Sequence, residues 1–410
     1  MITSQQQGKE LLYYQGLLAV GVIFFFFTFL DSYIAVQQII VSPVGWMLPY
    51  FALTVPLFLL GKLKFPSAGI LYWCAGYILL AVISYAWFPA STPALRALID
   101  RCFSAVFLLV TACLLADSQV QQWARFALVG ATMLGVLNNC YQLLDPFAFL
   151  GLVDNRVSGL YMDPNDCAYA LSLGMVLTVG IFPKKIRIPW ILMVGLGVMI
   201  TLSRGGMLAW VAAVLLLCLT RILPYRQAGL WILGVSTLVL VLVFSGEGDR
   251  FTTLSLVNEQ MFERGSDIIS GNTLFDPSAL ERKGILEKAW QMFLERPIFG
   301  YGIGSTSDYS ITGFTVSTHN MFLLHAAEYG IVGFLILPLI IYASTRWATG
   351  ETRKIAAVFI LVILISSLFS HTVLDLRSYL IGFALMAAMS ATHQAHFDPA
   401  LQIRNGRGNP

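Results

Sequence analysis

Residues 189–221 read PWILMVGLGVMITLSRGGMLAWVAAVLLLCLTR. Only Arg204 interrupts the uncharged run before Arg221 closes it. A bilayer core about 30 Å thick needs about 20 apolar residues in a helix, and only helices or closed barrels satisfy the backbone inside lipid. The run therefore predicts two membrane-spanning helices, near 189–203 and 205–221, joined by the turn that carries Arg204.

The chain as a whole has the composition of a membrane protein. Of its 410 residues, 57% are hydrophobic and 11% are charged, whereas soluble domains average about 45–50% and about 25%. So few charges cannot cover a water-facing surface, which excludes a soluble globular enzyme and a disordered chain. The net charge of +3 is too small to indicate a nucleic-acid partner. The six cysteines show no CxxC spacing, which argues against a disulfide framework and a zinc site.

Further apolar runs predict an all-α polytopic membrane protein with about twelve transmembrane helices. We expect them near residues 11–30, 45–61, 67–88, 102–117, 123–143, 165–183, 189–203, 205–221, 228–245, 319–343, 355–371 and 378–392. Basic residues in short loops mark the cytoplasmic side of a membrane, and here they fall in every second loop. These loops contain Lys62/Lys64, Lys184/Lys185/Arg187, Arg221/Arg226 and Arg346/Arg353/Lys354. Both termini are therefore expected in the cytoplasm.

This topology divides the chain into four regions. They are the first transmembrane helices (1–245), an outward-facing loop domain (246–318), the last transmembrane helices (319–392) and a cytoplasmic tail (393–410). In the loop domain, Asp276-Pro277-Ser278 is a helix-start signal. We therefore predict a helix over about 278–295, which Pro297 ends.

Several arginines lie on the outward side, where the charge rule predicts few. Arg282 shares the apolar stripe of the predicted helix in the loop domain. The stripe contains Leu286, Ala289, Trp290 and Phe293. An unpaired charge on a buried face is costly, and no acid lies on this stripe, so a bound anion is the expected partner of Arg282.

Two more arginines lie in outward-facing turns. The glycines after Arg204 would let the backbone approach a phosphate closely, and a guanidinium offers phosphate a bidentate fork; the alternative is a turn residue that reaches to the interface. Arg156 precedes another span, at whose start Asp163 and Pro164 are typical of a helix cap rather than a metal motif. Arg101 is expected to extend its charge to the membrane interface.

Histidine is rare in this chain. His319 opens a predicted span, and at helical spacing its face continues to Gly330 and Gly333. Small residues permit tight helix contact, so we expect His319 to point into the bundle. His325 and Glu328, at i and i+3, are expected to form a structural hydrogen-bonded pair.

Short motifs in this chain resemble the bacterial O-antigen ligases and their wider superfamily. His319-Asn320, nine further residues, Gly330 and Gly333 are similar to the ligase signature. Ser203-Arg-Gly-Gly206 and the helix start Asp163-Pro-Asn165 are similar to other stretches of the superfamily. So is the segment from Arg282 through Trp290 to Glu295-Arg-Pro-Ile-Phe-Gly-Tyr-Gly-Ile-Gly304. These motifs cover about residues 150–335.

The resemblance implies a GT-C-like helical fold in the bacterial inner membrane, with the loop domain and active site in the periplasm. Such ligases act in lipopolysaccharide biosynthesis and transfer a glycan from undecaprenyl pyrophosphate to the lipid A-core oligosaccharide. The resemblance gives His319 the role of activating the acceptor and gives Arg204 and Arg282 roles in binding the donor pyrophosphate. It says less about Arg156, which we place with them. Supporting or acceptor-binding roles are expected for Asn320, His371, Asp375, Arg377 and Arg296.

The residue chemistry agrees with this activity. Arginine forks can neutralise a leaving pyrophosphate without a metal, and histidine titrates near neutral pH, which suits a base for a sugar hydroxyl. Asp31 ends the first span outwardly, but no paired acid follows. We therefore expect a direct inverting transfer that needs no metal and no other cofactor.

Three other activities stay open. A polymerase would use a second lipid-linked glycan as acceptor, and a protein O-oligosaccharyltransferase would use a Ser or Thr of a protein. A secondary transporter could also have twelve spans, but it should show paired halves with broken helices. The sequence shows none, so the ligase is favoured.

Overall fold

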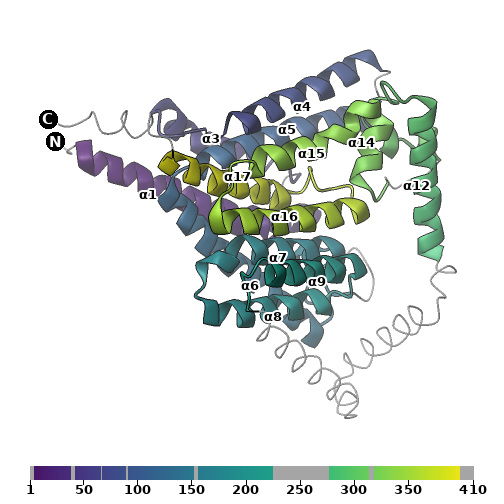
Figure 1. Ribbon diagram of the computed structural model, residues 1–410. Helices are drawn as coiled ribbons and strands as arrows, with labels where there is room; N and C mark the ends of the chain where they lie inside the picture. The colour runs from purple at the N-terminus through teal and green to yellow at the C-terminus, as the bar shows by residue number, and fades with distance from the viewer. Residues whose placement is uncertain are drawn as a thin grey trace, which may run out of the picture.

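The computed structural model describes residues 4–37, 42–65, 67–88, 91–151, 156–224, 277–313 and 318–397, and this part of the chain is helical (Figure 1). The longer helices are α1 (Ser4–Val22), α3 (Met47–Leu59), α4 (Ala68–Trp87), α5 (Thr92–Leu114), α6 (Ser118–Leu144), α7 (Pro164–Thr178), α8 (Lys184–Ile200), α9 (Arg204–Leu219), α12 (Pro277–Glu295), α14 (Met321–Tyr329), α15 (Gly333–Thr345), α16 (Gly350–Phe369) and α17 (Arg377–Phe397). The shorter ones are α2 (Leu30–Val36) and α13 (Tyr309–Thr312).

Six segments of the described chain are long and apolar enough to cross a membrane, as expected for a polytopic membrane protein. They are Gln6–Phe27, Ala68–Trp87, Thr92–Leu114, Ser118–Leu144, Met321–Thr345 and Gly350–Phe369. Shorter apolar helices occupy Met47–Leu59, Arg204–Leu219 and Arg377–Ala391. The predicted span at 228–245 lies outside the described residues, so the count of twelve stays a prediction.

The helices form two groups joined by a central pair (Figure 1). In one group α6, α7, α8 and α9 pack together, and in the other α4, α5 and α15 do. Between them, α16 packs on α7 and α9, while α17 packs on α5, α7 and α15. Every side chain of α7 from Cys167 to Thr178 is buried. An apolar helix enclosed in this way holds its polar N-terminal turn in a fixed place.

Helix α12 lies at the edge of the bundle and packs against α14 (Figure 1). Its bounds confirm the helix predicted over about 278–295. Its buried face differs from the predicted stripe, because Ile285, Ala289 and Met292 are buried whereas Trp290 is 46% exposed. Position 282 shares that buried face by helical spacing, but the Arg282 side chain lies outside the described residues.

The predicted span 319–343 bends sharply between α14 and α15, because a short 3₁₀ turn separates them. Gly330 has φ +65°, and an added Cβ there would lie 2.3 Å from the Ile298 carbonyl oxygen. At Gly333 an added Cβ would lie 1.9 Å from the His325 carbonyl oxygen. The expectation that these glycines extend the face of His319 along one helix is therefore wrong. They allow the chain to turn where no side chain fits.

Candidate functional site

The N-terminal end of α14 places His319 beside the end of α16. The Asn320 side chain caps α14, because its Oδ1 accepts a hydrogen bond from the Leu323 backbone N at 3.0 Å. Its Nδ2 donates to the Leu368 carbonyl at 3.5 Å. Asn320 thus fixes the junction at which His319 enters the helix.

His319 lies against His371, which follows α16. The two rings are in an edge-to-face arrangement, with their centroids 5.8 Å apart. His371 Nδ1 is buried and has no hydrogen-bond partner among the described residues. Burial and, to a smaller extent, the neighbouring His319 together lower the pKa of His371 to about 4. His371 is therefore a neutral imidazole near pH 7.

Asp375 and Arg377 follow His371 in the chain, and the charges that act on Asp375 include those of Arg101 and Glu328. Asp375 is held by a hydrogen bond from its backbone N to the Thr372 carbonyl at 2.9 Å. Burial raises the pKa of Asp375 to about 6, although Arg101 and Arg377 oppose that rise. Arg377 forms a buried ion pair with Asp31, with 3.1 Å between Nη2 and Oδ2. Asp31, without a paired acid in the sequence, thus has a basic partner.

Arg204 is the first residue of α9, in the turn predicted from the sequence. Ser203 caps the helix by accepting a hydrogen bond from the Gly206 backbone N at 3.1 Å, and it donates to Asn165 Oδ1 at 2.7 Å. Asp163 caps α7 by accepting from the backbone N of Asn165 at 2.7 Å. The capping interpretation of Asp163-Pro164 is confirmed.

Contacts continue from this turn to the histidines. The Asp166 carboxyl is hydrogen-bonded to the Thr372 side chain, next to His371. An added Cβ at Gly205 would lie 2.2 Å from the Tyr169 hydroxyl oxygen and 3.4 Å from the Phe369 ring. The ends of α7, α9, α14 and α16 therefore meet at one end of the bundle.

Arg156 belongs to the same group. Its Nε and Nη2 donate to the Thr201 carbonyl at 3.4 and 3.2 Å, in the turn that leads to Arg204. The structure thus brings together Arg156, Arg204, His319 and His371, which are far apart in the sequence.

Arg296 lies away from this group. Its guanidinium lies over the Tyr301 ring, 4.4 Å from the centroid. The Tyr301 backbone N donates to the Ala327 carbonyl at 2.8 Å, which is near the C-terminal end of α14. His319 precedes the N-terminal end of that helix, so Arg296 and His319 lie near opposite ends of α14.

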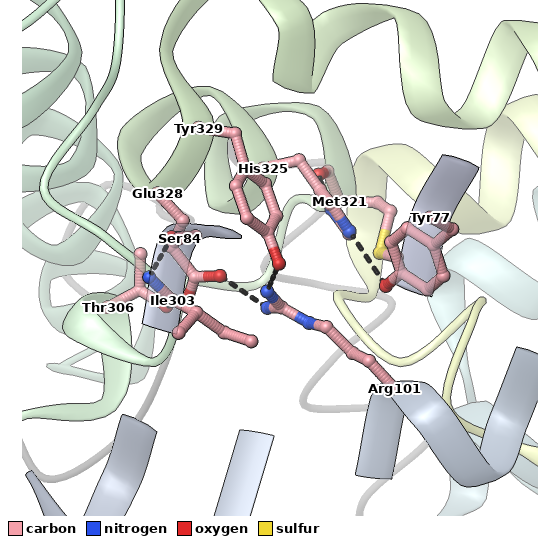
Figure 2. A network of polar contacts seen from close by, with 9 residues as sticks. All are labelled: Tyr77, Ser84, Arg101, Ile303, Thr306, Met321, His325, Glu328 and Tyr329. Carbon is pink, nitrogen blue, oxygen red and sulfur yellow. Dashed lines mark hydrogen bonds and ion pairs between the residues drawn. The ribbon is translucent and has the colours of Figure 1, made fainter. Parts of the chain in front are cut away.

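The C-terminal end of α14 carries a buried network that the sequence did not predict (Figure 2). Glu328 Oε2 pairs with Arg101, whose other terminal nitrogen donates to the Tyr329 hydroxyl. Glu328 Oε1 accepts a hydrogen bond from Thr306 at 2.8 Å. Arg101 is 5% exposed, so the expectation that it reaches to the interface is wrong. The signal available in the sequence was the presence of two opposite charges, Arg101 and Glu328, in or beside apolar spans.

The expected His325–Glu328 pair is also wrong, because each side chain has other partners. His325 Nε2 lies 3.2 Å from the Tyr77 hydroxyl, and its Nδ1 lies 3.1 Å from the Met321 carbonyl (Figure 2). Both ring nitrogens therefore have partners, and the contact with Tyr77 joins α14 to α4.

The group around His319 has the side chains for acid–base chemistry on an anionic ligand. It contains imidazoles, guanidinium groups and helix N-termini, and both guanidinium groups and helix N-termini favour negative charge. Within the described ranges, no three His, Cys, Asp or Glu side chains are grouped so that they could hold a metal ion. The arrangement can bind a phosphate-containing ligand and accept a proton beside it.

Residues 189–338 match a family model described as O-antigen ligase. The match contains Arg204, Arg282 and His319 and confirms the resemblance to the O-antigen ligase superfamily. It indicates a glycosyltransferase-like membrane enzyme. No curated protein matches the chain. A solved structure described as "Structural coordination of polymerization and crosslinking by a peptidoglycan synthase complex" matches with a TM-score of 0.44 and 14% identity, over 80% of this chain and 98% of that chain.

Proposed function

We propose, on the premise that residues 189–338 match the O-antigen ligase family, that the chain is an O-antigen ligase of the bacterial inner membrane. It transfers a glycan from undecaprenyl pyrophosphate to a sugar hydroxyl of the lipid A-core oligosaccharide. Both termini lie in the cytoplasm and the site faces the periplasm. The membrane-spanning helices and the family match support this proposal at the level of the superfamily.

The proposed reaction is one displacement at the anomeric carbon. His319 takes the proton of the acceptor hydroxyl as its oxygen forms a bond to that carbon. The bond from the carbon to the pyrophosphate oxygen breaks, the configuration inverts, and undecaprenyl pyrophosphate leaves with the bonding electron pair. His371, neutral near pH 7, adds no positive charge that would oppose proton uptake by His319.

Arg204, Arg156 and Arg282 are proposed to bind the pyrophosphate. Guanidinium forks stabilise the charge that develops on the leaving group. The reaction then needs no metal and no other cofactor.

The observation that carries the proposal is the meeting of four helix ends. It places the His319 and His371 rings on one side and the Arg156 and Arg204 turn on the other, linked through Asp166 and Thr372. A base and phosphate-binding groups at one end of a membrane bundle suit a lipid-linked pyrophosphate.

The test is a reconstituted transfer assay with undecaprenyl-pyrophosphate-linked glycan and rough lipopolysaccharide, in the presence of EDTA. A ladder of modified lipopolysaccharide is expected from the wild type and from His396→Ala near the C-terminal end of α17. No ladder is expected from His319→Ala, with membrane insertion unchanged. Normal laddering by His319→Ala would reject the base assignment, and activity that EDTA abolishes and Mg²⁺ restores would reject the metal-free mechanism.

The same assay separates the alternatives. Lengthening of the glycan on its lipid carrier would indicate an O-antigen polymerase, and transfer to Ser or Thr of an added protein would indicate a protein O-oligosaccharyltransferase. Solute uptake without any transfer would indicate a transporter.

A further inference from the structure

A cavity lies where the end of α4 and the start of α5 meet the segment after α12. It has a volume of about 240 Å³, which is below the roughly 300–1,000 Å³ of pockets for drug-sized ligands. Three of its lining residues are aromatic (Tyr85, Phe88 and Tyr301). Five others carry hydroxyl or carboxylate groups (Ser84, Ser91, Ser305, Asp308 and Ser310). None of the residues described above as the candidate site lines it.

The lining chemistry fits a neutral sugar ring better than a phosphate. Aromatic faces carry negative charge and attract the polarised C–H bonds on one side of a pyranose, while hydroxyl and carboxylate oxygens accept hydrogen bonds from its hydroxyls. Among the described lining residues there is one carboxylate and no Lys or Arg. The Arg296 guanidinium lies over the Tyr301 ring, 4.4 Å from the centroid, so one positive charge stands beside the one carboxylate and the cavity favours a ligand without net charge.

Ser305 gives an independent sign of a missing ligand. The residue is 5% exposed, and its hydroxyl oxygen has no hydrogen-bond partner in the described part of the chain. A buried polar group without a partner calls for an explanation, and an absent ligand or water is one.

Asp308 provides an ionised acceptor beside it. The hydrogen bond from the Ser310 hydroxyl, 2.6 Å from Asp308 Oδ1, lowers the pKa of this carboxyl. Asp308 is therefore charged at neutral pH and can accept hydrogen bonds from sugar hydroxyls.

We propose that this cavity is a glycan subsite that binds one neutral sugar ring of a substrate at a distance from the reacting bond. The proposal rests on the proposed function and extends it to substrate recognition. The sugar could come from the donor glycan or from the acceptor oligosaccharide, which share this chemistry.

Hydrogen bonds from the backbone of the cavity wall join it to α14 and to α4. The Gly302 backbone N donates to the Glu328 carbonyl at 3.0 Å, and the Ile303 backbone N donates to Ser84 Oγ at 2.9 Å (Figure 2). The nine residues of α14 span about 13 Å at 1.5 Å per residue. A ring bound here is therefore separated from His319 by about the length of that helix, which fits a sugar next to the reacting unit or further along the glycan.

Ser305→Ala tests the subsite with little risk to folding, because it removes a hydroxyl that makes no described hydrogen bond. The matched control is Ser344→Ala in α15, where the hydroxyl is also buried without a described partner but does not line the cavity. The transfer assay is run with each substrate varied while the other is saturating. Ser305→Ala is expected to raise the KM for one substrate about five-fold, which corresponds to the loss of one hydrogen bond, and to leave kcat unchanged. Ser344→Ala is expected to change neither constant.

The affected substrate identifies the source of the sugar, the donor glycan or the acceptor core. Unchanged KM values for both substrates in Ser305→Ala and in Asp308→Asn would overturn the subsite. Equilibrium binding of the two free oligosaccharides, released from their lipids, is measured on the same proteins by calorimetry. If the wild type shows no transfer activity but binds a sugar, and Ser305→Ala binds that sugar more weakly, the proposed function is rejected and the subsite is kept. The absence of sugar binding by the wild type would reject the subsite even if transfer occurs.

Discussion

The two ends of α14 differ in how the buried ionisable side chains there are paired. At the C-terminal end, Arg101 and Thr306 occupy both carboxylate oxygens of Glu328. Near the N-terminal end, the described structure leaves the Thr318 hydroxyl and His371 Nδ1 buried without hydrogen-bond partners. A satisfied network makes a core rigid and specific, whereas unpaired groups cost stability and are typical of functional sites. We infer that one end anchors the helix and the other presents side chains to a ligand.

Removal of the Glu328 carboxylate should have the largest effect on this contrast. Glu328→Ala leaves the Arg101 guanidinium buried without its counter-ion, which is expected to lower the free energy of unfolding by about 3–5 kcal/mol. Unfolding in mild detergent titrated with SDS measures the change. Glu287→Ala is the control, because its carboxylate is 62% exposed and its ion pair with Lys283 is a surface pair, for which about 0–1 kcal/mol is expected. Equal losses of unfolding free energy in the two variants would show that the Glu328 network does not anchor α14.

The pH dependence of stability tests the charged surroundings of Arg101 and Glu328 further, because both residues act on the Asp375 carboxyl. Because the pKa of Asp375 is raised from 3.8 to about 6 in the folded protein, the folded state holds a proton between these values that the unfolded state has lost. The contribution of Asp375 to stability therefore falls as the pH rises from about 4 to 6, and the cost is fully present at pH 7. Its size is on the order of 2–3 kcal/mol.

Asp375→Asn isolates this term, since Asp31 titrates in the same direction and His371 in the opposite one. The stability advantage of Asp375→Asn over the wild type is expected to grow from near zero at pH 4 to its full size at pH 7. An advantage that does not change with pH would show that Asp375 has an ordinary pKa.

The bend between α14 and α15 should come next in size. Gly330→Ala would force a side chain into a backbone conformation that favours glycine and against the Ile298 carbonyl. A loss of about 1–3 kcal/mol in the free energy of unfolding is expected, together with slower transfer as α14 shifts. Gly21→Ala in α1 is the control, because nothing lies within 4 Å of the added Cβ and helical Ala is favoured over Gly. A neutral Gly330→Ala would mean that the bend does not depend on glycine.

The sequence predicted those parts of the fold that depend on local signals. The turn at Arg204 and the start of α7 at Asp163 follow from a charge between apolar runs and from a cap followed by proline. The Arg101–Glu328 pair joins positions 227 residues apart, and no local spacing encodes it. The role of Gly330 also depended on a distant partner, since the Ile331 backbone N donates to the Pro297 carbonyl at 2.7 Å.

The candidate site was predictable as a set of residues but only partly as an arrangement. Residue type and outward position selected His319, Arg204 and Arg156, which the structure brings to one end of the bundle. The same criteria selected Arg296, which lies toward the other end of α14. Position along the chain cannot separate these cases, because the bend at Gly330 and the packing of α12 decide which helix end each residue reaches.

The smallest expected effect on stability tests the functional end directly. His371→Phe keeps a planar ring of similar size but removes the buried Nδ1 that has no partner in the described residues. The cost of an unpaired buried polar group disappears with it, so the free energy of unfolding is expected to rise by about 1 kcal/mol. Transfer should fall at the same time, because a phenyl ring beside His319 can neither donate nor accept a hydrogen bond. SDS titration and the transfer assay on one protein preparation measure both. A loss of stability instead would mean that Nδ1 makes a structural hydrogen bond, and the two ends of α14 would then be alike.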